Sequence, residues 1–182
     1  MGIIVSVVFG LALTAPISSA ALAAMIFTVA EGEVMGNGLL LAADAATVGC
    51  CAQIVGFAVS NFRENGVAGL IAQGLGTSML QVGNILAHPA ILIPPTLTSA
   101  LIGPLATTIF QMKNTSASAG MGTSGLVGQF GTWAAMSAEG AAAVLLKMLF
   151  LHIVLPAVLS LVISEFMRKK GWIKEGDMKL KL

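Results

Sequence analysis

Charged side chains are scarce in this sequence, and their scarcity sets its broad class. Only 9% of the 182 residues are Asp, Glu, Lys or Arg, whereas 57% are apolar. The mean hydropathy is +0.94, far above the profile of a water-soluble domain. The composition therefore indicates an integral membrane protein and argues against a soluble domain.

Metal-binding and redox residues are also few. The two cysteines, Cys50 and Cys51, are adjacent within an apolar run, so they form neither a CxxC redox pair nor a spaced metal site. The two histidines are not clustered with carboxylates, so no metal centre and no cofactor is expected. The sequence also has no phosphate-binding loop, nucleophile elbow or nucleic-acid-binding module. These absences argue against the common soluble enzymes and against a nucleic acid partner.

Long apolar runs are present, and a helix needs about 20 apolar residues to cross the core of a bilayer. The sequence predicts four such segments, the first of them bent near Pro16. The four are Ile3–Ala30, Leu39–Val59, Ala90–Met112 and Ala141–Ser164. Polar loops are predicted after the first two, at Glu31–Gly38 and Ser60–Gly66.

The stretch from residue 65 to residue 138 carries a single charge, Lys113, but glycine, proline and small hydroxyl residues break it repeatedly. Irregular backbone survives at membrane depth only where it is buried in protein or lines a wet cavity. Val67–Leu86 and Gly120–Met136 are therefore predicted to be broken or re-entrant segments around a buried polar site. The segment between them is expected to be interrupted by its prolines, which are Pro94, Pro95 and Pro104.

The predicted fold class is thus an all-α integral membrane protein, a helix bundle with discontinuous helices and two candidate re-entrant hairpins. Residues 1–165 are predicted to form the membrane domain and residues 166–182 a basic tail. Six of the nine Lys and Arg residues fall after Glu165. Under the positive-inside rule this cluster places the C-terminus of a multi-pass protein in the cytoplasm. There we expect a solvated tail that also touches anionic membrane lipid.

Four ionisable residues lie within or beside the apolar runs, where a charge is costly and usually faces a partner or a cavity. They are Asp44, Glu139, Lys147 and His152. One hypothesis pairs Asp44 or Glu139 with Lys147 inside the bundle. The alternative places both carboxylates near the membrane interface and lets Lys147 extend its amine towards water.

Three segments stand out, at residues 74–78, 88–94 and 122–130. In order and approximate spacing they resemble the membrane subunits (enzyme IIC) of sugar phosphotransferase systems. The run His88–Pro94 (HPAILIP) is similar to their Asn-Pro-…-Ile-Pro segment, and Gly122–Phe130 (GTSGLVGQF) is similar to their second glycine-rich hairpin. Gly74–Ser78 (GLGTS) stands where those porters have Gly-Ile-Thr/Asn-Glu-Pro, whose Glu binds the sugar. The resemblance covers most of Val67–Met136 well and the flanking helices loosely.

The departures from this pattern are informative. Thr77 stands where the family has its sugar-binding Glu, and Ser78 stands where it has Pro. A hydroxyl exchanges hydrogen bonds with a polyol but does not replace a carboxylate acceptor. The chain looks closest to a divergent branch, the toxin-regulator group named after the perfringolysin regulator (PfoR-like). There Pro94–Phe110 and Gly120–Gly131 look most alike.

The resemblance implies bundled helices and two re-entrant hairpins, usually in a homodimer, with a sugar or polyol ligand held between the hairpin tips. Such discontinuous segments leave free backbone groups that bind polar ligands. The candidate ligand-binding residues are Gln73, Thr77, Ser78, Gln81, Asn84 and His88 from the first hairpin, and Thr123, Ser124 and Gln129 from the second. Singly, each is better explained by a local or interhelical hydrogen bond, whereas the cluster as a whole favours a binding site.

The resemblance leaves three interpretations. The first is a sugar or polyol permease subunit, whose phosphoryl donors are separate cytoplasmic phosphotransferase subunits, so that the chain alone is not a complete enzyme. The second is a membrane regulator or sensor that has lost transport, which the missing Glu favours. The third is a partial chain. The abrupt apolar start and the short length indicate a C-terminal half that works with a separate N-terminal membrane half.

Overall fold

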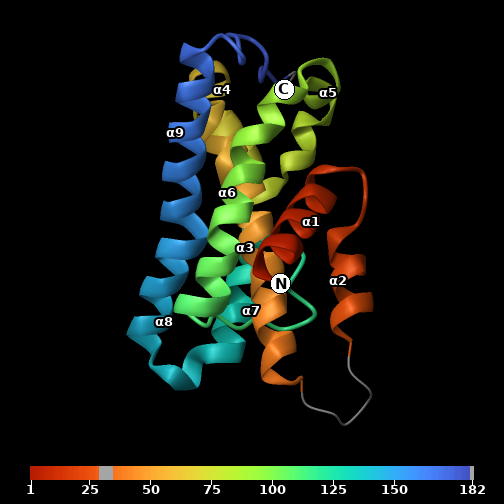
Figure 1. The fold of residues 1–182 in the computed structure, drawn as a ribbon, viewed down its shortest axis with the longest axis vertical. Coiled ribbons are helices and arrows are strands. Elements are labelled where there is room, and N and C mark those ends of the chain that lie inside the picture. The colour runs from red at the N-terminus through yellow and green to blue at the C-terminus, as the bar shows by residue number, and fades with distance from the viewer. Residues whose placement is uncertain (29–34, 181–182) are drawn as a thin grey trace.

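The computed structural model describes residues 1–28 and 35–180, and within these ranges the chain is helical, with no strand (Figure 1). The predicted all-α membrane fold is confirmed. Among the described residues, three helical runs are long and apolar enough to cross a membrane. They are Asn37–Ser60, Pro89–Ile109 and Ala141–Lys169.

Helix α3 (Asn37–Ser60) is the centre of the bundle, and its middle is buried on every side. The helices α1 (Gly2–Thr14), α6 (Ile93–Pro104) and α9 (Leu155–Lys169) pack around it. The approach of α1 is very close, because a side chain on Gly49 would overlap the backbone of Ser6. Small residues allow this backbone contact, which is a common way for helices to associate in membranes.

The prediction that Ile3–Ala30 forms one bent membrane span is wrong. The chain forms two short helices, α1 and α2 (Ser19–Phe27), and reverses direction between them (Figure 1). Ala15 is extended, with φ −70° and ψ 161°, because the residue before a proline is driven out of the helical region. Ser18 then caps α2 by accepting a hydrogen bond from the Ala21 amide at 3.2 Å. The predicted end of this span at Ala30 and the first half of the predicted loop at residues 31–38 lie outside the described residues. The last two residues of that predicted loop, Asn37 and Gly38, already belong to α3.

The proline-containing segment is a continuous helical run from Pro89 to Ile109, so the expected interruption does not occur. It begins with the 3₁₀ turn η3 (Pro89–Leu92), continues as α6 and ends with the π-helical turn η4 (Leu105–Ile109). Two prolines lie in the first turn of α6, where a missing N–H costs little, and Pro104 immediately precedes the wider π turn.

The first hairpin, defined here as Phe62–Ala87, is broken as predicted. It consists of α4 (Phe62–Ile71), the π turn η1 (Ala72–Gly76), the 3₁₀ turn η2 (Ser78–Gln81) and α5 (Val82–Ala87). Thr77 is fully extended, with φ −151° and ψ 143°, and the chain turns around it. Figure 1 shows α4 and α5 at the same end of the molecule, with the tip of the hairpin reaching down between the longer helices.

The second hairpin, defined here as Lys113–Met136, enters as irregular backbone and returns as a helix. The irregular part leads into the 3₁₀ turn η5 (Ser124–Leu126) and then α7 (Val127–Met136). Gly122 has φ 54°, a left-handed conformation that suits glycine, and it lies against Cys50 of α3. The tip at η5 contacts η1 of the first hairpin, so the two tips meet beside α3.

The last span is confirmed in length and composition and extends beyond its predicted end. After the short turn η6 (Ser137–Glu139), it runs through α8 (Ala141–Met148), the π turn η7 (Leu149–Val154) and α9. The sequence predicted a solvated tail, but in the structure part of the tail is buried. Ile173 and Met178 are buried against Phe57, Ile91 and Met167, because the tail folds back onto the bundle.

Candidate functional site

A buried polar cluster lies where the second hairpin meets α3 and the last span. Asp44 of α3 is completely buried and accepts a hydrogen bond from the Thr132 hydroxyl of α7 at 3.1 Å. The Nε2 atom of His152 lies 3.5 Å from the same carboxylate oxygen, Oδ1. Three separate elements therefore meet at one carboxylate inside the bundle.

His152 is held from its other side by the second hairpin. Its Nδ1 atom lies 3.2 Å from Nε2 of Gln129, and because that amide nitrogen donates, Nδ1 acts as the acceptor in this arrangement. The same Gln129 nitrogen lies 3.5 Å from the Cys51 thiol. His152 is completely buried and belongs to the π turn η7. Single π turns in helices are frequent at functional sites.

Several polar atoms of this region have no hydrogen-bond partner. They are Oδ2 of Asp44, Oε1 of Gln129, Nε2 of His152 and Oγ1 of Thr123. A buried polar group left unpaired costs about 1–3 kcal/mol. Such atoms usually mark a bound water, ion or ligand, or a functional role. The cluster therefore has unused donor and acceptor capacity inside an apolar bundle.

The irregular entry to the second hairpin is held by its own hydrogen bonds. Asn114 donates to the Thr47 hydroxyl at 2.6 Å and to the Gly128 carbonyl at 3.1 Å. The Ser118 hydroxyl donates to Oδ1 of Asn114 at 2.6 Å. These contacts satisfy backbone and side-chain groups that cannot be left exposed to lipid. They also fix α7, which carries Gln129, against α3.

A cavity of about 300 Å³ lies between the two hairpin tips. Its polar side chain is Thr123, and the rest of its lining is apolar or glycine. The other lining residues are Val55, Ala58, Val59, Leu70, Ile71, Gly74, Leu75, Leu126, Ile153 and Ala157. In this conformation the cavity suits hydrocarbon better than a polyol, whose hydroxyls need hydrogen-bond partners.

At the tip of the first hairpin, the predicted ligand residues bind other parts of the protein. The Ser78 hydroxyl lies 2.8 Å from that of Thr14 in α1. Thr77 accepts a hydrogen bond from the Met79 amide at 3.1 Å, and Gln73 is buried and paired with Asn61. These three residues therefore connect the tip to α1, to its own backbone and to α3.

The remaining first-hairpin candidates lie at its base. Gln81 and Asn84 donate to backbone carbonyls of Met178 and Lys179, each at 3.1 Å. His88 lies 3.5 Å from Asp177 and is half exposed. The nine candidates thus lie in three places rather than in one site: the first tip, the hairpin base and, for Thr123, Ser124 and Gln129, the second hairpin.

The hypothesis that Lys147 pairs with Asp44 or Glu139 is wrong. Its amine lies 3.4 Å from the Phe110 carbonyl, whereas Asp44 contacts His152. Glu139 instead pairs with Lys113 at 2.8 Å, with 41% of the Glu139 side chain exposed. His152, rather than Lys147, is the residue that lies against the buried carboxylate of Asp44. The feature of the sequence that could have indicated this is a histidine within a long apolar run.

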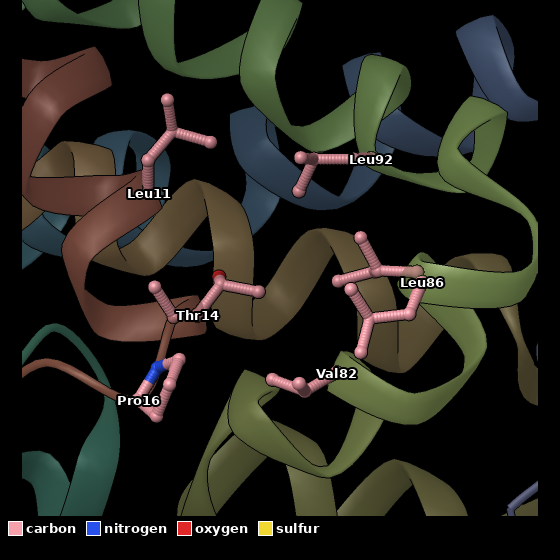
Figure 2. A pocket seen from close by; sticks show the side chains of 8 residues that line it. Leu11, Thr14, Pro16, Val82, Leu86 and Leu92 are labelled. Atoms are coloured by element: carbon pink, nitrogen blue, oxygen red, sulfur yellow. The ribbon is translucent and has the colours of Figure 1, made fainter.

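A second apolar cavity, of about 230 Å³, opens between α1 and the first hairpin. Figure 2 shows Leu11, Thr14 and Pro16 on one side and Val82, Leu86 and Leu92 on the other. The lining is almost entirely hydrocarbon, so this cavity offers few groups to orient a polar ligand. No cluster of three or more His, Cys, Asp or Glu side chains suited to a metal ion occurs among the described residues.

The apolar helices and the buried polar cluster define an integral membrane protein with a polar site inside its bundle. The family described as "Phosphotransferase system, EIIC" matches residues 1–180, and the chain belongs to this family. It is therefore a membrane component of the phosphotransferase type. Searches of curated proteins and of solved structures gave no match.

Proposed function

We propose that this chain binds a sugar or polyol and carries it across the membrane as the membrane subunit of a phosphotransferase system. The main support is the family match over residues 1–180. The structure adds two hairpin tips that meet beside a buried polar cluster with unpartnered atoms. Polar groups at the tips of discontinuous segments are a usual means of binding solutes in transporters.

In this proposal the polar ligand binds at the second hairpin. Gln129 and Thr123 provide unpartnered oxygens, and Asp44 provides an unpartnered carboxylate oxygen. Sugar hydroxyls donate to such acceptors, so binding would satisfy atoms that are otherwise unpaired. The apolar cavity between the tips lies next to Thr123 and would open to admit the ligand.

Phosphoryl transfer would take place with separate cytoplasmic subunits. The basic end of the chain, which includes Arg168, Lys169 and Lys170, supports a cytoplasmic C-terminus under the positive-inside rule. Assembly as a homodimer is part of the same proposal. In this arrangement the chain supplies ligand binding and permeation, and its partners supply the phosphoryl group.

Ligand binding is the direct test. The purified chain in lipid nanodiscs is titrated calorimetrically with a panel of hexoses, hexosamines and hexitols. The Gln129→Leu variant removes the unpartnered oxygen and should weaken binding about 5- to 150-fold, since a hydrogen bond left unmade at a buried partner costs about 1–3 kcal/mol. Lys113→Gln, at the exposed pair with Glu139, is the control. Equal affinities of Gln129→Leu and the unmodified chain would refute this site.

A regulator without transport activity is the second candidate, and the apolar lining of the cavity between the tips favours it. Thr77, which stands at the position of the family's sugar-binding Glu, hydrogen-bonds its own backbone rather than facing this cavity. Deletion of the gene distinguishes the two functions. Loss of uptake of one sugar supports the permease, whereas unchanged uptake with altered transcript levels supports the regulator.

A further inference from the structure

The C-terminal tail bridges the two arms of the first hairpin through a single carbonyl group. The Met178 carbonyl accepts one hydrogen bond from Asn65 of α4 at 2.8 Å and another from Gln81 in the other arm at 3.1 Å. Both donors are side-chain amides, and neither arm donates to the other at this point. The tail therefore joins α4 to the 3₁₀ turn η2, which leads into α5.

Side-chain amides also contact the backbone on either side of this carbonyl. Asn65 accepts a hydrogen bond from the Leu180 amide at 2.7 Å, so its two amide atoms pair with residues 178 and 180 as a neighbouring strand would. Asn84 donates to the Lys179 carbonyl at 3.1 Å, and Glu64 accepts from the Met178 amide at 2.9 Å. Every one of these contacts uses tail backbone, so they recognise the backbone of the turn at residues 175–178 and the two residues after it, with little dependence on their side chains.

One side chain of the tail enters the protein core. Met178 is completely buried, among Phe57, Ile91, Met167 and Ile173. The next residue, Lys179, is exposed. An unbranched apolar side chain suits an irregular pocket of this kind. The site therefore combines backbone hydrogen bonds with one apolar pocket, the combination by which peptide-binding grooves obtain affinity and specificity.

The arms of the hairpin bury little of their own surface. Gly69 is the buried residue of α4, and α5 has no buried residue. Elements with few buried contacts open at low free energy. The tail is itself anchored, because Arg168 at the end of α9 lies 2.7 Å from Glu64. It supplies contacts between the arms that their own sequences do not.

We propose that the two arms of the first hairpin form a peptide-docking groove, that the chain's own residues 177–180 occupy it, and that this docked segment holds the hairpin closed. Release of the segment would free both arms at once, since they share one carbonyl acceptor. The proposal goes beyond ligand transport and does not depend on it. It assigns Gln81 and Asn84, two predicted ligand residues, to peptide binding instead.

The test compares hydrogen exchange in nanodiscs between the full-length chain and two variants that each introduce one carboxylate into the tail. Met178→Asp puts a carboxylate into the apolar pocket, whereas Lys179→Asp introduces it at an exposed neighbouring position. We expect exchange in peptides from Phe62–Ala87 to rise at least about tenfold in Met178→Asp and to change less than about twofold in Lys179→Asp. Exchange in the middle of α3 should stay unchanged in both.

A peptide of residues 173–180, added in trans, should restore protection of the hairpin in Met178→Asp. The same peptide with Asp at position 178 should not. An undocked, freely exchanging tail beside a fully protected hairpin would overturn the proposal, and so would equal effects of the two substitutions. If Met178→Asp does not fold, Leu180→Pro removes a single donor to Asn65 and leaves the pocket intact. Unchanged exchange of the hairpin in that variant would also count against the proposal.

Discussion

The crossing of α1 and α3 depends on the absence of side chains at two glycines, Gly10 and Gly49. The loss of stability on replacing each by alanine should therefore follow how closely the new Cβ approaches the other helix. A Cβ on Gly10 would lie 2.8 Å from the Gly49 carbonyl oxygen. A Cβ on Gly49 would lie 2.7 Å from Cα of Ser6 and would overlap the Ser6 carbonyl oxygen. In both cases the nearest atoms are backbone, so relief requires movement of a whole helix rather than of one side chain.

Alanine at Gly49 should therefore destabilise the fold more than alanine at Gly10. Overpacking of this kind costs about 1–3 kcal/mol, and Gly49→Ala belongs at or above the upper end because its contacts are the shorter. Gly38→Ala, in the same helix as Gly49, has nothing within 4 Å of the new Cβ. It should be neutral or stabilise by about 0.5–1 kcal/mol, because alanine favours the helix.

The native cysteines provide the assay. Cys50 and Cys51 are buried and free, so a thiol-reactive dye should label them only as the bundle opens. In a chain of this length each kcal/mol shifts the unfolding midpoint by about 2–4 °C. The expected order of midpoints is Gly38→Ala, then Gly10→Ala, then Gly49→Ala, from highest to lowest. Equal midpoints for Gly38→Ala and Gly49→Ala would refute the close backbone contact.

Three further predictions concern polar groups. Asp44→Leu should lower stability by about 0.5–1.5 kcal/mol, the net value of one hydrogen bond, because the Thr132 hydroxyl loses Asp44 but still donates to the Gly128 carbonyl at 3.1 Å, whereas Asp44→Asn keeps an acceptor and should cost less; dye labelling of the cysteines would show the difference. Lys113→Met should change stability by no more than about 1 kcal/mol, since its partner Glu139 is exposed, and a larger loss by the same assay would show that the pair is stronger than surface geometry implies. In the folded protein, maleimide should label neither cysteine faster than the chain unfolds, which time-resolved mass spectrometry would check.

Composition and local pattern predicted the parts of this fold that depend on solvent. The long apolar runs predicted the membrane class and the last span, and the glycine content predicted that Val67–Leu86 is broken; the structure places that break at Thr77. Prolines were harder to interpret. Pro16 separates two helices and reverses the chain, whereas Pro94, Pro95 and Pro104 are contained in one helical run. The same residue has opposite effects because position within the turn decides whether its missing N–H matters.

The candidate site was predicted only in part. The sequence singled out Gln129 and Thr123 as candidate ligand residues and Asp44 as a charge within an apolar run. In the structure, Gln129 and Asp44 lie on opposite sides of the His152 ring. The sequence identified His152 as an ionisable residue of the last span but did not assign it to the site. It follows Lys147 in the same apolar run, and hydropathy does not distinguish which of two polar residues faces the bundle when a π turn shifts the helical face between them.

The sequence by itself determined the solvent in which this chain folds, the helical class and the broken segment Val67–Leu86, because these depend on local composition and backbone chemistry. The tertiary structure alone decided the partners: Asp44 with His152, Glu139 with Lys113, and the tail backbone with Asn65, Gln81 and Asn84. Such pairs join residues that are mostly far apart in the chain. Their choice depends on how α3 is surrounded, and no local pattern of residues encodes that arrangement.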